Sequence, residues 1–273
     1  MKKKADVVIV GTGVAGLFSA LNLPDDKEII MITKSDAESS DSFLAQGGIC
    51  VLRDEQDYDS YFEDTMRAGH YENRKESVDI MIRSSGKIIE DLVGYGVEFE
   101  KDGEAFAYTR EGAHSRPRIL FHADVTGKEI TSKLLARVRE KNNVTIYEYT
   151  TMTDILEENG KCAGITVKTQ SGEESSIYAD YTILASGGIG GLYQHSTNFP
   201  HLTGDALEVA KKHHIRLENL DYVQIHPTTL YSEKPGRRFL ISESVRGEGA
   251  LLYNKNMERF VDELLPRDVV TKA

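Results

Sequence analysis

Apolar and polar residues follow one another at spacings that predict alternating strands and helices at the start of the chain. Residues 7–10 and 28–33 are short, mainly apolar runs, typical of strands buried on both faces of a parallel sheet. Residues 17–23 between them predict a helix, which Pro24 ends. The first 35 residues are therefore predicted to form a β-α-β unit.

Longer helices are predicted where apolar residues recur at helical spacing, at 77–93 and 127–141, and a shorter one at 205–213. Asn159-Gly160 and Ser171-Gly172 predict the turns of a β-meander. The strands predicted after residue 143 lie at 144–149, 152–156, 163–169, 175–178 and 181–185. This order of elements indicates the α/β class.

The composition changes after about Asn219, where segments become shorter and richer in His, Arg, Glu and Gly. We therefore predict one domain at 1–218 and a second at 219–273. Pro266 suits the first turn of a helix, but only about two turns follow and no C-cap glycine ends them. We expect the chain to be a truncated portion of a longer protein, with an incomplete second domain.

Composition and charge exclude several classes of protein. Hydrophobic residues make up 40 % and charged residues 28 % of 273, which is ordinary for a globular protein, and the net charge of −11 disfavours nucleic acid as a partner. Cys50 and Cys162 lack metal-ligand spacing, so we expect neither a disulfide framework nor a metal site. No signal peptide and no apolar stretch of membrane-spanning length is present, which favours a cytoplasmic protein without a membrane partner.

The motif Gly11-x-Gly13-x-x-Gly16 lies between the first predicted strand and helix. Gly11 permits a tight turn, Gly13 lets the backbone approach a pyrophosphate, and Gly16 lets helix and strand pack closely. A glycine-rich turn without a ligand is the alternative, but the strand–turn–helix context favours dinucleotide binding. The second strand ends in Thr33-Lys34 instead of the acidic residue of an NAD site, so other groups, such as Lys34, must hold the nucleotide.

Two more glycine motifs are Ala45-Gln46-Gly47-Gly48 and the cluster at 185–191. With the first motif and the meander, they make the chain resemble the succinate dehydrogenase, fumarate reductase and L-aspartate oxidase family of flavoproteins, from Gly11 to Pro266-Arg267-Asp268. The resemblance implies a Rossmann-type FAD-binding domain with a β-meander insertion, followed by the first part of a smaller α+β capping domain.

The resemblance also implies which residues bind FAD: Gly11, Thr12, Gly13, Val14, Ala15, Gly16, Lys34, Asp41, Ser42, Phe43, Leu44, Ala45, Gln46, Gly47, Gly48, Met152, Thr153, Ser186, Gly187, Gly188 and Asp205. In succinate and fumarate members, a histidine four residues before the alanine of the second motif attaches to the flavin. Asp41 occupies that position here, and no histidine precedes Gly48. We therefore expect FAD to be bound noncovalently.

Residues 109–120 read TREGAHSRPRIL, which a charged surface loop would also explain. The pattern is similar to the aspartate oxidase version of this segment and differs from the succinate dehydrogenase version. The resemblance implies that Glu111 faces the ammonium group of the substrate. A carboxylate there suits an amino acid and would repel a third anionic group.

The remaining catalytic residues are also implied by the resemblance. His226 and Ser242 would bind substrate carboxylates, and Arg267 would transfer a proton through a relay of Glu243 and Arg246. A helical turn would place Arg246 on the same face as Glu243. A structural histidine and a surface arginine are the alternatives for His226 and Arg267, and the combined pattern disfavours them.

The expected activity is FAD-dependent oxidation of L-aspartate to iminoaspartate, which feeds quinolinate synthesis on the way to NAD, with electrons passed to oxygen or fumarate. Quinolinate synthase is a further expected partner. Three alternatives stay open: a soluble fumarate reductase or succinate oxidase, another FAD enzyme acting on an α-oxo or amino acid, and a flavin-binding fragment without activity.

Overall fold

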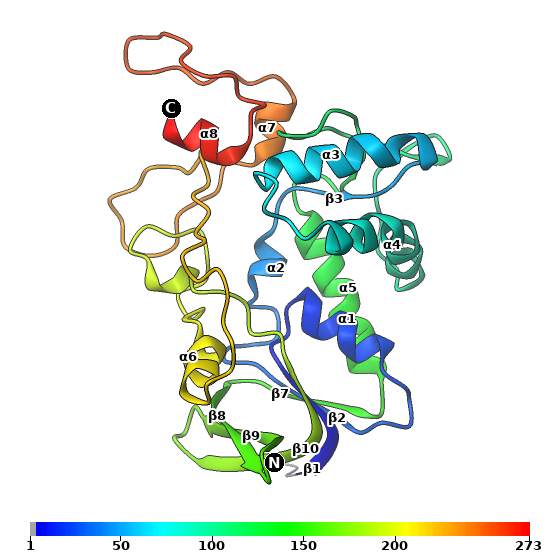
Figure 1. Cartoon of the computed structure of the whole chain (residues 1–273), viewed down its shortest axis with the longest axis vertical. Coiled ribbons are helices and arrows are strands. Elements are labelled where there is room, and N and C mark those ends of the chain that lie inside the picture. Colours follow the sequence, from blue (N-terminus) through cyan, green and yellow to red (C-terminus); the bar gives the residue numbers. More distant parts are fainter. Residues whose placement is uncertain (1–3) are drawn as a thin grey trace. The chain divides into compact units, whose positions relative to one another are not determined.

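The predicted β-α-β unit is present in the computed structural model, which describes residues 4–273 (Figure 1). Its elements are β1 (Lys4–Val10), α1 (Val14–Asn22) and β2 (Ile29–Ile32). All four residues of β2 and the last four of β1 are buried. Their sequences lack alternation because neither face of these strands meets water.

The central sheet has six strands in the order β7-β2-β1-β10-β9-β8. The four strands added here are β7 (Val144–Tyr147), β8 (Thr150–Glu158), β9 (Lys161–Thr169) and β10 (Glu174–Leu184). Strands β7, β2, β1 and β10 pair in parallel, whereas β10, β9 and β8 form an antiparallel meander. The prediction of an α/β fold with a β-meander is confirmed.

One continuous strand, β10, replaces the two strands predicted at 175–178 and 181–185. Its first half pairs with β9 up to Tyr178, and from Tyr178 to Leu184 it pairs with β1. The prediction of a break was wrong: residues 178–181 contain neither glycine nor proline, and Ala179 between the two halves is buried in the core.

Helices cover both faces of the parallel strands. On one face, Val8 of β1 and Ile30 of β2 join a buried cluster with the meander and with Val209 of α6 (Asp205–Lys212). On the other face, α1 packs closely, since a Cβ on Gly16 would lie 3.4 Å from Ile9. Figure 1 shows α1 and α5 (Thr126–Glu140) on one side of β1 and β2 and α6 on the other. Ligands of such sheets bind beyond the carboxyl ends of the strands.

The described chain divides into two compact units that do not follow a single boundary near Asn219. Unit 1 extends to Leu44 and also holds Ile130–Asp221 and Lys234–Arg238, whereas unit 2 holds Ala45–Glu129, Tyr222–Glu233 and Phe239–Ala273. Hydrogen bonds between distant segments explain the grouping of unit 2; for example, Ala113 N donates to Leu264 O at 2.9 Å.

Unit 2 is mainly helical. The helix predicted at 77–93 is α4 (Lys75–Gly94), and α3 (Tyr58–Ala68) was not predicted. The other elements outside the central sheet are α2 (Asp41–Leu44) in unit 1, and β3 (Ile49–Cys50), β4 (Lys101–Asp102), β5 (Ala105–Phe106), β6 (Ile119–Leu120), α7 (Glu243–Gly247) and α8 (Arg267–Lys272) in unit 2. None of the helices in residues 4–273 combines the length and the apolar character that crossing a bilayer requires.

A fully buried arginine, Arg118, anchors α3 within unit 2. It donates to Asp57 through Nε at 3.0 Å and through a terminal nitrogen at 2.9 Å, and to Asp64 at 2.7 Å. Burial raises the pKa of both carboxyls, but hydrogen bonds outweigh this effect: those from Arg118 and Ser60 to Asp57, and those from Ser115 and Arg118 to Asp64. Both pKa values therefore lie below the ordinary value, and both groups are charged when folded.

Replacing Arg118 by methionine is expected to destabilise the fold by about 3–5 kcal/mol at neutral pH, because two buried carboxylates lose their counter-ion. The depressed pKa values stabilise the folded state above the unfolded pKa of about 4, and this stabilisation is lost as the pH falls through the folded values. The difference between wild type and variant should therefore shrink on acidification. Urea denaturation at pH 7 and at a pH below about 3 measures it, and a constant difference would contradict the expectation.

Arg67→Met is the matched control, since Arg67 also pairs with Asp64 but its side chain is 50 % exposed. This replacement should lower the free energy of unfolding by less than about 1 kcal/mol.

Candidate functional site

The glycine loop after β1 requires glycine at two positions. Gly11 has φ +112°, and a Cβ there would lie 2.3 Å from Ala185 O. A Cβ on Gly16 would lie 2.1 Å from Gly11 O. Gly13 caps α1 without a side-chain hydrogen bond, and the first turn of α1 contains no acidic residue. The helix N-terminus is therefore suited to an anionic group such as a phosphate.

This loop forms part of a cleft of about 540 Å³ within unit 1. The cleft brings together 13 of the predicted cofactor-binding residues: Gly11, Thr12, Gly13, Val14, Ala15, Lys34, Asp41, Ser42, Met152, Ser186, Gly187, Gly188 and Asp205. The other predicted residues are not in its lining: Gly16, Phe43, Leu44, Ala45, Gln46, Gly47, Gly48 and Thr153. Gly16 lies beneath the loop, and the Thr153 hydroxyl is instead 2.9 Å from that of Thr166.

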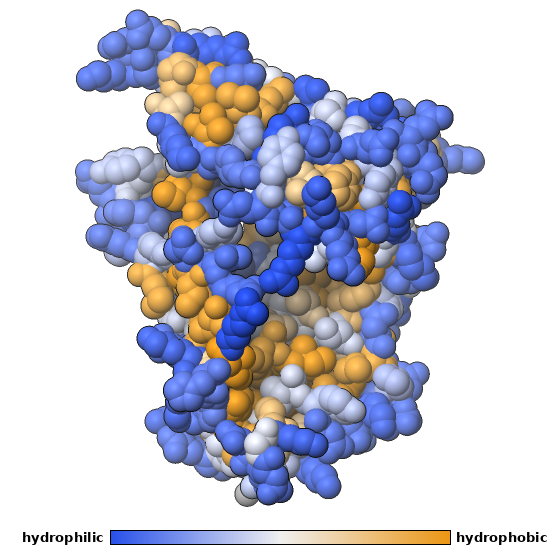
Figure 2. Space-filling model, viewed as in Figure 1, coloured by the Kyte–Doolittle hydropathy of each residue, from blue (hydrophilic) through white to orange (hydrophobic). Residues whose placement is uncertain are grey.

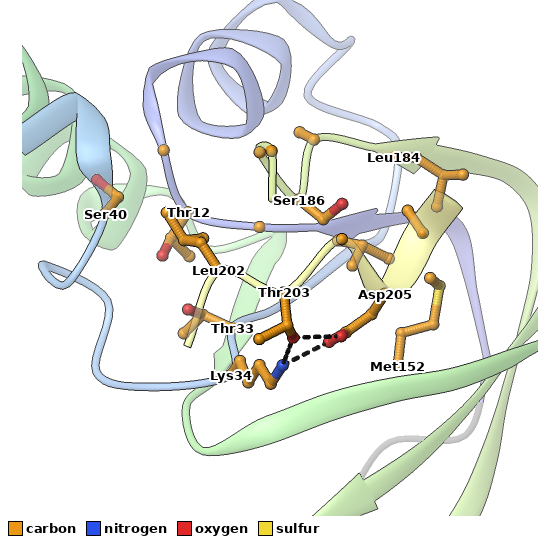
Figure 3. A pocket seen from close by; sticks show the side chains of 18 of the residues that line it. Thr12, Thr33, Lys34, Ser40, Met152, Leu184, Ser186, Leu202, Thr203 and Asp205 are labelled. Carbon is orange, nitrogen blue, oxygen red and sulfur yellow. Dashed lines mark hydrogen bonds and ion pairs between the residues drawn. The ribbon is translucent and has the colours of Figure 1, made fainter. Parts of the chain in front are cut away.

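An acidic side chain reaches the end of β2 from a distant part of the chain (Figure 3). Lys34 Nζ lies 2.7 Å from Asp205 Oδ2 and 2.6 Å from Thr203 Oγ1, and Thr203 donates to Asp205 Oδ1 at 2.7 Å. Lys34 neutralises the carboxylate of Asp205 within the cleft. A carboxylate at this place can accept hydrogen bonds from ribose hydroxyls.

Asp41 fixes a wall of the same cleft. Its carboxylate accepts hydrogen bonds from the side chain of Asn198 and from Phe199 N at 3.0 Å. Burial raises the pKa of Asp41, against the lowering effect of the Phe199 hydrogen bond. The segment that follows supplies lining residues that the sequence did not predict: His201, Leu202 and Thr203. Their only sequence signal is their position directly before the glycine that precedes α6.

Apolar side chains complete the lining. Figure 2 shows hydrophobic side chains at the surface in the region where Figure 1 draws the central sheet. Val14, Leu184 and Ile215 line the cleft and are more than one third exposed. The glycine cradle, a helix N-terminus with no acidic residue in its first turn and the apolar walls fit a dinucleotide with a planar ring system, as FAD is.

Unit 2 contains the predicted catalytic residues, of which three form one cluster. Glu243 Oε2 is 2.5 Å from Arg267, and Glu243 Oε1 is 3.2 Å from a terminal nitrogen of Arg246. Both Glu243 and Arg246 are buried on α7, three residues apart, as the helical spacing predicted. Arg246 also donates to Glu263 O at 2.6 Å, while its Nε has no hydrogen-bond partner within residues 4–273.

Arg267 is the exposed end of this cluster, with 37 % of its side chain accessible. It donates to Gln224 Oε1 at 2.9 Å, a contact that the sequence did not predict. The guanidinium group is therefore oriented from two sides and still reaches solvent. Such a planar, permanently charged group binds a carboxylate with two parallel hydrogen bonds.

Glu111 is buried beside the second glycine motif. A Cβ on Gly47 would lie 3.0 Å from its carboxylate, and Gly48 N donates to it at 3.4 Å. Ser244 Oγ donates to the same oxygen at 3.2 Å. Burial, followed by repulsion from Glu243, raises the pKa of Glu111 above its usual value of 4.5. A desolvated carboxylate of this kind binds a cation strongly, since the cation restores its charge balance.

His226 and Ser242 complete the predicted set. Burial, followed by the positive charge of Arg267, lowers the pKa of His226, which is therefore a neutral imidazole at pH 7. His226 Nδ1 is 3.2 Å from both the nitrogen and the carbonyl oxygen of Thr228. Ser242 caps α7 by accepting from Ser244 N. All six residues predicted to be catalytic thus lie in unit 2.

Gly11→Ala is expected to weaken FAD binding roughly tenfold or more, because the alanine is strained at positive φ and its Cβ displaces Ala185 from the cleft. Titration of FAD followed by flavin fluorescence measures the effect. Gly86→Ala in α4 is the matched control. Its Cβ meets nothing within 4 Å, and it should raise stability by about 0.5–1 kcal/mol with unchanged FAD affinity. Equal affinities of wild type and Gly11→Ala would refute the assignment.

Known proteins resemble this chain throughout its length. Two curated relatives are the L-aspartate oxidases of Clostridium perfringens and Clostridium acetobutylicum, which are 49 % and 45 % identical over the whole chain. The chain covers 62 % and 63 % of these relatives, or about three fifths of their length. Among solved structures, the FrdA chain of Escherichia coli quinol fumarate reductase matches with a TM-score of 0.91 and 27 % identity, over 100 % of this chain and 50 % of that one.

A family model also matches residues 6–273, nearly the whole chain, and its description is FAD binding domain. The match includes the glycine loop, the cleft of unit 1 and the buried cluster of unit 2. The chain therefore belongs to the FAD binding domain family, and its cofactor is FAD.

Proposed function

We propose that the protein oxidises L-aspartate to iminoaspartate. The observation that carries the proposal is Glu111, a buried carboxylate in the same unit as the cationic residue Arg267. The ammonium group of an amino acid can neutralise the negative charge of Glu111. A dicarboxylate without an amino group brings no positive charge with which Glu111 could pair. The names of the curated relatives, L-aspartate oxidase, support the same substrate.

In this proposal Arg267 and His226 bind the substrate carboxylates. Arg267 carries a permanent positive charge, and Glu243 and Gln224 hold its guanidinium group in place. His226 is neutral and can donate one hydrogen bond without adding charge. Ser242 supplies a hydroxyl near the start of α7. Glu111 accepts hydrogen bonds from the ammonium group and so fixes which face of the Cα carbon is presented.

The oxidation removes two electrons and two protons from the substrate as its C–N single bond becomes a C=N double bond. FAD, when bound, accepts the two electrons together with the hydrogen on Cα as a hydride. The nitrogen must lose the other proton, which Arg267 can pass on by giving a proton to the carboxylate of Glu243, 2.5 Å away, as it takes one from the substrate. The protein contributes orientation and charge, which are the larger part of such catalysis.

Fumarate reduction or succinate oxidation is the second candidate. The fold similarity to the fumarate reductase FrdA chain supports it. Glu111 opposes it, because a third carboxylate repels a dianionic substrate. Asp41 opposes it too, since it stands at the position of the histidine that attaches to the flavin in that branch. A fragment without activity is the third candidate, because the chain spans about three fifths of its relatives. A cytoplasmic location, noncovalent binding of FAD and a partnership with quinolinate synthase stay predictions.

The proposal is tested by loading the chain with FAD, removing the excess, and recording the visible spectrum before and after anaerobic addition of L-aspartate or succinate. Bleaching by L-aspartate alone is expected. Bleaching by succinate alone would support the second candidate. A chain that retains no flavin, or whose flavin stays oxidised with both compounds, would refute the proposal for this chain.

Glu111→Gln is expected to remove the acidic limb of the pH dependence of kcat/KM for L-aspartate. In wild type the limb should lie above pH 4.5, since burial and Glu243 raise the pKa of Glu111 and only its charged form binds the ammonium group. Activity should thus fall as the pH falls through that raised pKa. Rates measured from pH 4 to pH 9 test this, with reoxidation of the reduced protein by fumarate as the reference reaction. An unchanged limb in the variant would assign it to another group.

A further inference from the structure

The loop that carries Glu111 depends on anchors outside itself. Ala113 has φ +66°, a conformation that disfavours residues with a Cβ. His114 N donates to Glu111 O at 3.4 Å, a long hydrogen bond that closes the turn only weakly. Ala113 N donates to Leu264 O at 2.9 Å. A strained turn of this kind keeps one conformation only when its surroundings impose it.

Asp64 of α3 supplies the strongest of these anchors. Its Oδ2 accepts hydrogen bonds from the nitrogen and from the hydroxyl of Ser115, both at 2.7 Å. Its Oδ1 accepts from Arg67 at 2.8 Å, and the same nitrogen of Arg67 donates to Ala113 O at 3.3 Å. One buried carboxylate thus holds the loop at Ser115 directly and at Ala113 through Arg67.

Arg118 keeps Asp64 in place. The guanidinium nitrogen that is 2.7 Å from Asp64 also lies 3.1 Å from Nδ1 of His114 in the loop. Asp57 accepts hydrogen bonds from Nε and from the other terminal nitrogen of the guanidinium group. Since Arg118 is fully buried and Asp64 is 3 % exposed, water does not compete for these hydrogen bonds.

The Glu111 carboxylate itself is held only loosely. Its contacts with Gly48 N at 3.4 Å and with Ser244 Oγ at 3.2 Å are long, and Glu243 repels it. Its position must therefore come largely from its backbone, which the anchors at 113–115 fix.

We infer that Asp64 is a positioning residue for Glu111 and, through it, sets the preference for L-aspartate over dicarboxylates that lack an ammonium group. The inference rests on the proposed function, in which Glu111 binds that group. The hydrogen bonds of Asp64 come from Arg67, Ser115 and Arg118, none of which is a proposed ligand of the substrate. Asp64 acts through Ser115, Arg67 and Ala113.

The test compares Asp64→Asn with wild type in the FAD-loaded protein. The asparagine keeps the shape but loses the charge that holds three donors on one oxygen. We expect kcat/KM for L-aspartate to fall roughly tenfold or more and reoxidation by fumarate not to fall, because only the former reaction needs Glu111 in place and the charge of Glu111 repels fumarate. An equal loss in both reactions would reduce Asp64 to a structural role and overturn the inference.

Asp57→Asn is the matched control. Asp57 is as buried as Asp64 and binds the same arginine, but the hydrogen bonds of its carboxylate come from Arg118 and Ser60 instead of the loop. It should lower Tm about as much as Asp64→Asn but change the ratio of kcat/KM for L-aspartate to the rate of reoxidation by fumarate much less, because the hydrogen bonds from Ser115 and Arg67 to Asp64 remain. The same change of ratio in both variants would contradict the inference.

Milder variants cover the case in which Asp64→Asn does not fold. Ser115→Ala removes one hydrogen bond to Asp64, and Arg67→Ala removes the link to Ala113 from a side chain that is half exposed. Both should shift the ratio in the same direction, by a smaller factor. If both folded variants keep the wild-type ratio, the inference is wrong.

The double variant with Glu111→Gln separates this inference from the proposed function. If Asp64 acts through Glu111, adding Asp64→Asn to Glu111→Gln should not lower the ratio of L-aspartate oxidation to reoxidation by fumarate any further. A ratio that Glu111→Gln leaves unchanged would contradict the proposed function. A ratio that falls with Glu111→Gln but not with Asp64→Asn would contradict only the inference.

Discussion

The close approach of two backbones at the carboxyl end of β1 determines the geometry of unit 1. Gly11 N donates to Ile32 O and Ala185 N donates to Val10 O, both at 2.8 Å, so the ends of β2, β1 and β10 are joined side by side. The parallel register of these strands brings the three turns that follow them to one edge of the sheet. Helix α1 begins at that edge, and its N-terminus offers a partial positive charge to a phosphate there.

Unit 2 depends on a different principle, the pairing of buried charges. Glu243 lies between two arginines, and Arg118 lies between two aspartates. Each group is too costly to bury alone, and each therefore fixes its partners in place. Glu111 differs from all of these, since its carboxylate forms no ion pair within residues 4–273 and the charge of Arg267 only partly offsets its burial. A site that leaves one carboxylate uncompensated is prepared for a positively charged group from outside.

The sequence was sufficient where a residue's environment is local. Apolar spacing placed α4 within two residues of its observed start, and the glycine loop was identified from three residues and their flanking elements. It was insufficient where the environment is made by distant segments. Helix α3 was not predicted: Asp64 on its buried face is polar, and its burial depends on Arg118 and Ser115, which lie outside the helix. Contacts between distant segments also explain three features that the sequence did not reveal. These are the ion pair of Lys34 with Asp205, the position of Thr203 in the cleft, and the grouping of residues 45–129 with the C-terminal residues.

The pairing of Lys34 with Asp205 also has a consequence for biosynthesis. The two residues are 171 positions apart, and the cleft is lined as far as Leu217. The β-α-β unit leaves the ribosome first, but residues 150–152 and residues within 184–217 also line the cleft. Because domains emerge from the ribosome gradually and fold as units, the cleft is complete only after its last lining residue, Leu217, has been made. Complete contact with the cofactor therefore has to follow the synthesis of that residue.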